Sequence, residues 1–84
     1  MEKTIDIYTT PTCGFCTALK GFLKEHKVEY REHDVTQDPT ALEEMQALSG
    51  GSMQVPFTVF NKGQSNQTTL IGFDQEKVSQ ALNL

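Results

Sequence analysis

The chain has 84 residues, of which 37% are hydrophobic and 21% are charged, so it can form one small globular domain with a modest core. Its net charge of -4 and its pI near 4.9 argue against nucleic acid as a partner. No apolar run reaches membrane-spanning length, nothing resembles a signal peptide, and two cysteines cannot build the framework of a secreted mini-protein. We therefore expect a single cytoplasmic domain over residues 1–84, monomeric and without a membrane partner.

The first half of the chain predicts a strand, a helix and a second strand. Lys3 to Tyr8 alternates, with Ile5 and Ile7 on one face, and residues 9–12 end this strand. Apolar residues then recur at helical spacing, namely Cys16, Leu19, Phe22 and Leu23. Val28 to Val35 predicts a weaker strand, and its many charges suit the edge of a sheet.

The second half predicts a helix, two strands and a last helix. Asp38 followed by Pro39 is typical of a helix start, and Gly50-Gly51 is typical of its end. Val55 to Phe60 is an apolar strand that begins at Pro56, and Thr68 to Ile71 follows after a turn. Asp74 is expected to cap a helix with a short inner face, formed by Val78, Ala81 and Leu82.

This order, β-α-β-α-β-β-α, predicts an α/β fold with a four-stranded mixed sheet flanked by three helices. A right-handed crossover makes the first two strands parallel, and the short connection at 61–67 makes the last two antiparallel. Cys13 then follows the carboxyl end of the first strand, where open α/β sheets place their chemistry.

Both cysteines lie in the stretch Cys13-Gly14-Phe15-Cys16. A CxxC that follows a strand and opens a helix is typical of a redox-active dithiol. The thiolate is the nucleophilic form, and unpaired N–H groups at the helix start favour negative charge on Cys13. Cys16 lies one turn further along on the same face, where it can displace a mixed disulfide formed at Cys13. We expect Cys13 to attack and Cys16 to resolve.

Two other interpretations of the cysteines are open at this point. A structural disulfide that closes so short a loop would stabilise the fold by roughly 2 kcal/mol or less. Half of a zinc site would need two more ligands, and His26 and His33 are the only histidines. His26 is expected about 15 Å from Cys13, at the far end of the helix. We therefore predict no metal site.

Three segments give the chain its resemblance to a known family: residues 8–16, Val55-Pro56, and residues 71–74 with the sequence Ile-Gly-Phe-Asp. Together they resemble a glutaredoxin over essentially the whole chain. The resemblance implies a minimal thioredoxin fold and a thiol–disulfide oxidoreductase that reduces protein or glutathione mixed disulfides, with no tightly bound cofactor. It also implies that Pro56 is cis and faces the dithiol, and that the Val55 backbone pairs with substrate.

The chain departs from the family pattern in ways that bear on its electron donor. Glutathione-using members usually carry Lys or Arg where this chain has Thr10, and a second glycine where it has Phe73 after Gly72. Gly-Phe at this site resembles the redoxins that serve ribonucleotide reductase and receive electrons from a thioredoxin-reductase-type flavoenzyme. Glutathione and such a flavoenzyme are thus both candidate donors. Gly14 resembles the monothiol, iron–sulfur-carrying members, so a cluster bound through Cys13 and glutathione is the alternative function.

Five further residues are candidate substrate or glutathione contacts: Thr12, Phe15, Gly72, Phe73 and Asp74. We expect Phe15 to form an exposed platform beside Cys13, because the helix stripe points elsewhere. Thr12 either contacts substrate or caps the helix. Phe73 adds bulk where the resemblance would dock the γ-glutamyl group of glutathione. Asp74 is a helix cap first and a clamp for a substrate amino group second.

Overall fold

The predicted order of elements is confirmed in the computed structural model, which describes residues 4–82. Within that range the chain forms four strands and three helices: β1 (Ile5–Thr9), α1 (Gly14–Glu25), β2 (Arg31–Asp34), α2 (Pro39–Ser49), β3 (Phe57–Phe60), β4 (Thr68–Ile71) and α3 (Gln75–Leu82). The strand order is β2-β1-β3-β4, with β1 and β2 parallel and the other neighbours antiparallel. The charged strand β2 is an edge strand, as predicted.

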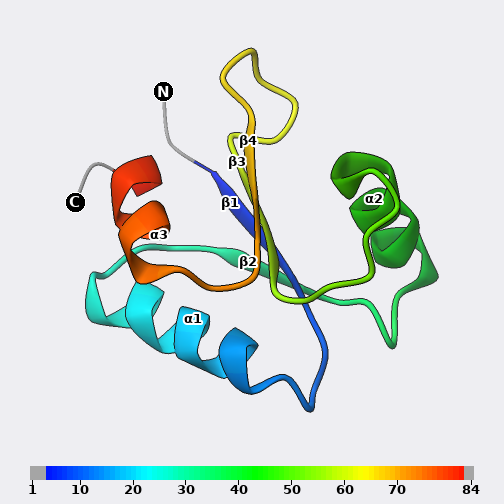
Figure 1. Ribbon diagram of the computed structural model, residues 1–84, viewed down its shortest axis with the longest axis horizontal. Coiled ribbons are helices and arrows are strands. Elements are labelled where there is room, and N and C mark those ends of the chain that lie inside the picture. The colour runs from blue at the N-terminus through cyan, green and yellow to red at the C-terminus, as the bar shows by residue number, and fades with distance from the viewer. Residues whose placement is uncertain (1–3, 83–84) are drawn as a thin grey trace.

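Alternation along the two central strands creates two apolar layers. In β1, Ile5 and Ile7 face α1 and α3, whereas Tyr8 faces α2. In β3, Phe60 joins the first layer and Phe57 joins the second. Figure 1 shows the same division, with α1 and α3 on one side of the sheet and α2 on the other. The helices therefore bury β1 on both faces, and the chain passes from β1 through a short turn into the cysteine pair.

The second strand is shorter than predicted, because Val28 belongs to the end of α1. Lys27 has a left-handed backbone with φ of 57°, and its N–H bonds the carbonyl of Lys24 at 3.0 Å. The N–H of Val28 bonds the carbonyl of Leu23 at 2.9 Å. These two bonds are those of a Schellman cap, and Val28 packs on the same apolar cluster as Leu23. The strand proper begins only at Arg31.

Two other strand boundaries also move. β3 begins at Phe57 rather than Pro56, because proline has no N–H to offer to a ladder. β1 extends to Thr9, whose carbonyl accepts the N–H of Val35 at 3.0 Å. Lys3, the first residue of the predicted strand, lies outside the described residues.

A polar network fastens α2 to the turn after β3. Lys62 Nζ donates to both carboxylate oxygens of Glu44 at 2.7 Å, and the Tyr8 hydroxyl donates to Oε1 at 3.2 Å. The bond from Lys62 holds the pKa of Glu44 below its ordinary value and raises the pKa of Lys62 itself. Burial raises the pKa of the Tyr8 phenol.

Replacing Lys62 with Gln is expected to destabilise the fold by about 0.5 kcal/mol near pH 7, since water screens a pair this exposed. The lowered pKa of Glu44 means that its contribution is present above the unfolded pKa of about 4.3 and is lost as pH falls through the folded value. The pKa of Lys62 is raised, so the contribution of the pair to stability is also lost as pH rises through the folded pKa of Lys62. Urea unfolding at pH 3 and pH 7 tests this. A difference that persists undiminished at pH 3 would contradict it.

Candidate redox site

The cysteine pair lies where the carboxyl end of β1 turns into α1. The N–H of Cys13 bonds the carbonyl of Thr10 at 3.3 Å, which closes the turn between strand and helix. Cys13 is the N-cap residue of α1, with extended backbone angles, and its Sγ accepts the N–H of Cys16 at 3.1 Å. The two cysteines form a disulfide, with their Cα atoms 5.2 Å apart. The chain thus presents the oxidised form of the pair.

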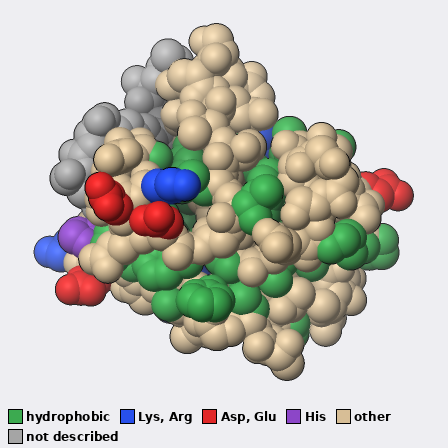
Figure 2. All heavy atoms as spheres, in the orientation of Figure 1, with side chains coloured by type: hydrophobic (Ala, Val, Ile, Leu, Met, Phe, Trp, Pro, Cys, Tyr) green, Lys and Arg blue, Asp and Glu red, His purple; other side chains and the backbone are tan. Residues whose placement is uncertain are grey.

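The two sulfurs differ in their access to solvent. Cys16 is only 1% exposed and continues the buried stripe of α1, whereas Cys13 is half-buried. Phe15, between them, is 68% exposed, as predicted. Hydrophobic side chains gather on the face of the molecule that carries α1 (Figure 2). An approaching disulfide would therefore meet Cys13 first, beside an apolar surface.

The Val55-Pro56 bond is cis, as the family resemblance implied. Phe57, the next residue, pairs with Tyr8 near the carboxyl end of β1, so Pro56 lies at the end of the sheet from which the chain leads to the cysteines. Pro56 is fully buried, and its carbonyl accepts the N–H of Gly72 at 2.8 Å. Val55 is half-buried. The hydrogen bond between Gly72 and Pro56 joins the loop that contains Val55 and Pro56 (the Pro56 loop) to the segment that follows β4.

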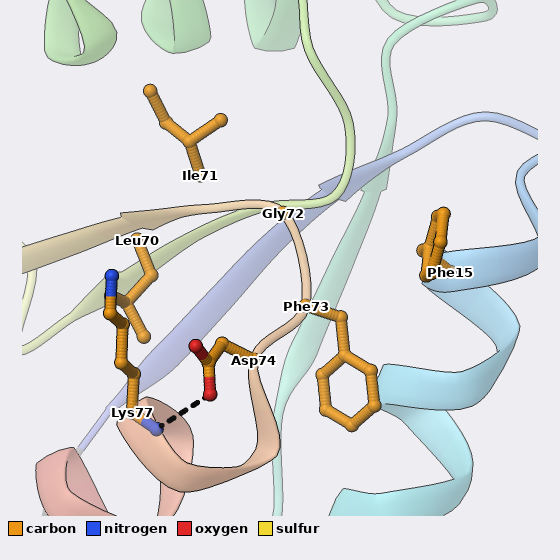
Figure 3. A pocket seen from close by; sticks show the side chains of 7 residues that line it. All are labelled: Phe15, Leu70, Ile71, Gly72, Phe73, Asp74 and Lys77. Carbon is orange, nitrogen blue, oxygen red and sulfur yellow. Dashed lines mark hydrogen bonds between the residues drawn. The ribbon is translucent and has the colours of Figure 1, made fainter.

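A groove of about 320 Å³ opens between the first turn of α1 and the segment from β4 to α3. Its lining residues are Phe15, Leu70, Ile71, Gly72, Phe73, Asp74 and Lys77. Figure 3 shows Phe15 on α1, across from the segment that carries Asp74 and Lys77. Gly72 has a φ of 81°, which favours glycine at the bend where this segment leaves β4. The bend and the helix together shape the groove.

Four of the predicted contact residues, Phe15, Gly72, Phe73 and Asp74, come together in this groove. Phe73 has a second role, because its ring points toward α1 and lies 5.9 Å from the ring of Phe22 (Figure 3). It therefore belongs partly to the core beneath the groove.

Thr12 and Asp74 were both predicted as possible helix caps, and only Asp74 is one. Thr12 does not cap α1, because Cys13 does, and Thr12 is exposed in the turn. Asp74 caps α3, since its Oδ1 accepts the N–H groups of Glu76 and Lys77 at 3.0 and 3.3 Å. Within residues 4–82, its Oδ2 takes no hydrogen bond.

Sequence reasoning missed Lys77, whose side chain lines the groove. The signal was available, since Asp74 as a cap places Lys77 in the first turn of α3. Lys20, by contrast, does not line the groove, and its Nζ forms an ion pair with Glu32 at 2.9 Å. The bond from Lys20 lowers the pKa of Glu32, which also accepts the Thr9 hydroxyl at 2.8 Å.

Neither a metal centre nor a membrane span is evident in the part of the chain that the structure describes. Residues 4–82 contain no group of three or more His, Cys, Asp or Glu side chains placed to hold a metal ion. None of the helices in that range is long and apolar enough to cross a membrane.

The sheet, the three surrounding helices and the CxxC at the start of α1 define a thioredoxin-fold protein. The glutaredoxin family model matches residues 5–65, and the chain belongs to the glutaredoxin family. A relative in Mycobacterium tuberculosis that carries the glutaredoxin name is 34% identical over 63 residues, which is 75% of each chain. Proteins of this family are in general thiol–disulfide oxidoreductases, and the Cys13–Cys16 pair fits that class.

Solved structures extend the likeness over nearly the whole chain. The crystal structure of the thioredoxin-like protein BC3987 is 32% identical, with a TM-score of 0.80, and the match covers 93% of this chain and 99% of that one. A glutaredoxin from Archaeoglobus fulgidus has a TM-score of 0.79 at 21% identity, with 95% of this chain and 86% of that chain covered, and supports the fold alone.

Proposed function

We propose that the protein reduces protein or glutathione mixed disulfides through Cys13 and Cys16. The Cys13 thiolate attacks one substrate sulfur, a bond forms between Cys13 and that sulfur, and the other half of the substrate leaves as a thiolate. Cys16, after losing its proton, then attacks Sγ of Cys13. The internal disulfide forms and the second half of the substrate leaves as a thiolate. Two electrons have passed from the protein to the substrate.

The observation that carries this proposal is the difference between the two sulfurs. Cys13 Sγ lies at the amino end of α1 and accepts the N–H of Cys16, an arrangement that favours the thiolate. Cys16 is buried behind it and within reach of it, as the disulfide demonstrates. A more accessible attacking sulfur with a second sulfur within reach of it suits a two-step exchange.

Substrate binding is proposed to use the Pro56 loop and the groove together. Val55 precedes Pro56 just before β3 begins, outside the strand ladder, so its backbone N–H and C=O can pair with an extended substrate segment. The hydrogen bond between Gly72 and Pro56 keeps this loop next to the groove. A disulfide-bearing peptide would then lie across Phe15 toward Cys13. The proposed substrates are cytoplasmic client proteins, with a ribonucleotide-reductase-like enzyme as one candidate.

The electron donor is proposed to be a thioredoxin-reductase-type flavoenzyme rather than glutathione. Thr10 brings no positive charge to the turn before Cys13, and Phe73 fills space where a second glycine would leave room. Two assays of the oxidised protein test this proposal, one with glutathione and one with a thioredoxin reductase and NADPH. Anaerobic purification is the third arm, since a brown product would favour the iron–sulfur alternative.

Replacing Thr10 with Lys is expected to raise glutathione-dependent turnover about two- to fivefold, as one exposed ion pair allows. The reason is that the ammonium would lie beside the turn that Thr10 and Cys13 close, where a glutathione carboxylate can reach it. Turnover with the flavoenzyme should not rise. If the unmodified protein already turns over with glutathione at ordinary glutaredoxin rates, the proposed donor is wrong.

A further inference from the structure

Lys77 occupies a position that helix stability does not explain. It is the third residue of α3, and its N–H bonds the capping carboxylate of Asp74. Positive charge in a first turn opposes the helix dipole. A Glu or Gln at this position would instead reach back to the cap residue. A lysine here therefore disfavours α3, although only by a small amount.

The side chain of Lys77 is also free to bind something else. It is exposed and lines the groove, and within residues 4–82 its Nζ makes no ion pair. Lys20 and Lys62, by comparison, are both engaged by glutamates. Lys77 follows the exposed acidic residues Asp74 and Glu76 at the start of α3. In a chain with a net charge of -4, this ammonium is a local exception.

The charged residues of the groove, Asp74 and Lys77, both come from the segment between β4 and α3, which also contributes apolar residues to the lining. Lys77 and Asp74 stand on the side of α3, and Phe15 stands across from them on α1 (Figure 3). Phe15 lies in the first turn of α1, the turn that Cys13 caps, so a ligand that fills the groove from Lys77 to Phe15 reaches that turn. A ligand anchored at Lys77 would thus extend toward the turn of α1 that carries the attacking sulfur.

We propose that Lys77 is a specificity-determining residue that binds a carboxylate of the disulfide substrate and so favours acidic substrates. This inference rests on the proposed disulfide exchange at Cys13 and names its substrate class. The carboxylate belongs either to glutathione or to an acidic residue near the cystine of a peptide. Both present the same chemistry to the ammonium.

The test measures how fast the fully reduced protein is oxidised by four disulfides, followed by acid quench and mass analysis. The disulfides are oxidised glutathione, its carboxyl-esterified form, a peptide disulfide with Glu near its cysteine, and the same peptide with Gln. Lys77→Gln and Lys77→Arg are compared with the unmodified protein. Lys24→Gln is the matched control, because Lys24 is exposed at the far end of α1.

Lys77→Gln should slow oxidation by the acidic disulfides about two- to fivefold and leave their neutral counterparts unchanged. Lys77→Arg and Lys24→Gln should keep the original rates. The difference should fade in about 0.5 M salt, where the Debye length falls to a few ångströms. A loss confined to glutathione, or to the acidic peptide, identifies the source of the carboxylate.

Other results overturn the inference or the proposed function separately. If Lys77→Gln slows oxidation equally with acidic and neutral disulfides, or slows it with neither acidic disulfide, Lys77 does not select substrates by their charge. If the unmodified protein is oxidised by none of the four disulfides while iodoacetamide still alkylates Cys13, the proposed exchange itself fails and the inference with it.

Discussion

Replacing Cys13 with Ser is expected to abolish disulfide exchange altogether. A hydroxyl does not ionise near neutral pH and cannot form a disulfide, so neither the first nor the second step can occur. Replacing Cys16 with Ser should preserve the first step and stop the second, because the resolving thiolate is missing. The Cys16→Ser protein should therefore accumulate as a mixed disulfide at Cys13, which intact-mass measurement detects as an adduct of one substrate half.

Alkylation of the reduced protein provides an independent test of the same roles. Cys13 is half-buried at the helix start, whereas Cys16 is 1% exposed, so iodoacetamide at pH 6 should label Cys13 first. Peptide mapping after short exposures separates the two sites. Faster labelling of Cys16 would reverse the assignment, and a mixed disulfide trapped in Cys13→Ser would do the same.

The sequence predicted those elements whose signals are local. The stripe of Cys16, Leu19 and Leu23 is the buried face of α1. Asp38 caps α2 through Oδ1, which accepts the N–H groups of Thr40 and Ala41 at 3.0 and 3.3 Å. Such signals depend on residues within one or two turns of each other, and tertiary packing did not override them.

The strand boundaries were harder to predict, because they depend on the backbone conformation at a helix end and on contacts between distant segments. Valine is a residue type that favours strands, yet the N–H of Val28 takes part in the cap of α1. The left-handed backbone of Lys27 is what brings it there. Thr9 belongs to β1 because Asp34 lies beside it in the parallel register. The pairing of Thr9 with Asp34 does not follow from the residues nearby in sequence.

In the candidate site, too, features set by nearby residues were predicted and features set by packing between distant segments were not. The cysteine spacing and the cap at Asp74 are local features and were predicted from the residues, whereas the cis bond at Pro56 was implied by the family resemblance. The approach of Phe15 to the segment carrying Lys77 depends on how α1 and α3 pack on the sheet. The two positions of Phe73, in the groove and against Phe22, depend on the same packing. Side-chain direction across two helices is a property of the folded chain.

Replacing Phe73 with Ala is expected to lower the free energy of unfolding by about 2 kcal/mol, roughly half the cost of truncating a fully buried phenylalanine. Phe73 is half-buried and packs against the cluster that contains Phe22 and Val78. In a domain this small, the change corresponds to a fall in melting temperature of about 8–16 °C. Urea unfolding of the reduced and oxidised forms measures it. The variant should also admit bulkier substrate groups to the groove.

Phe15→Ala is the matched control, since it removes the same side chain from the opposite wall of the same groove. Because Phe15 is 68% exposed, its loss should change stability by less than about 0.5 kcal/mol while still slowing exchange with apolar substrates. A double-mutant cycle between Phe73 and Phe22 should give a coupling energy of about 0.5–1.5 kcal/mol, as expected for an aromatic pair. If Phe73→Ala and Phe15→Ala lower the free energy of unfolding by the same small amount, Phe73 lines the groove but does not contribute to the core. In that case the side chain of Phe73 could disfavour glutathione only by the space it occupies.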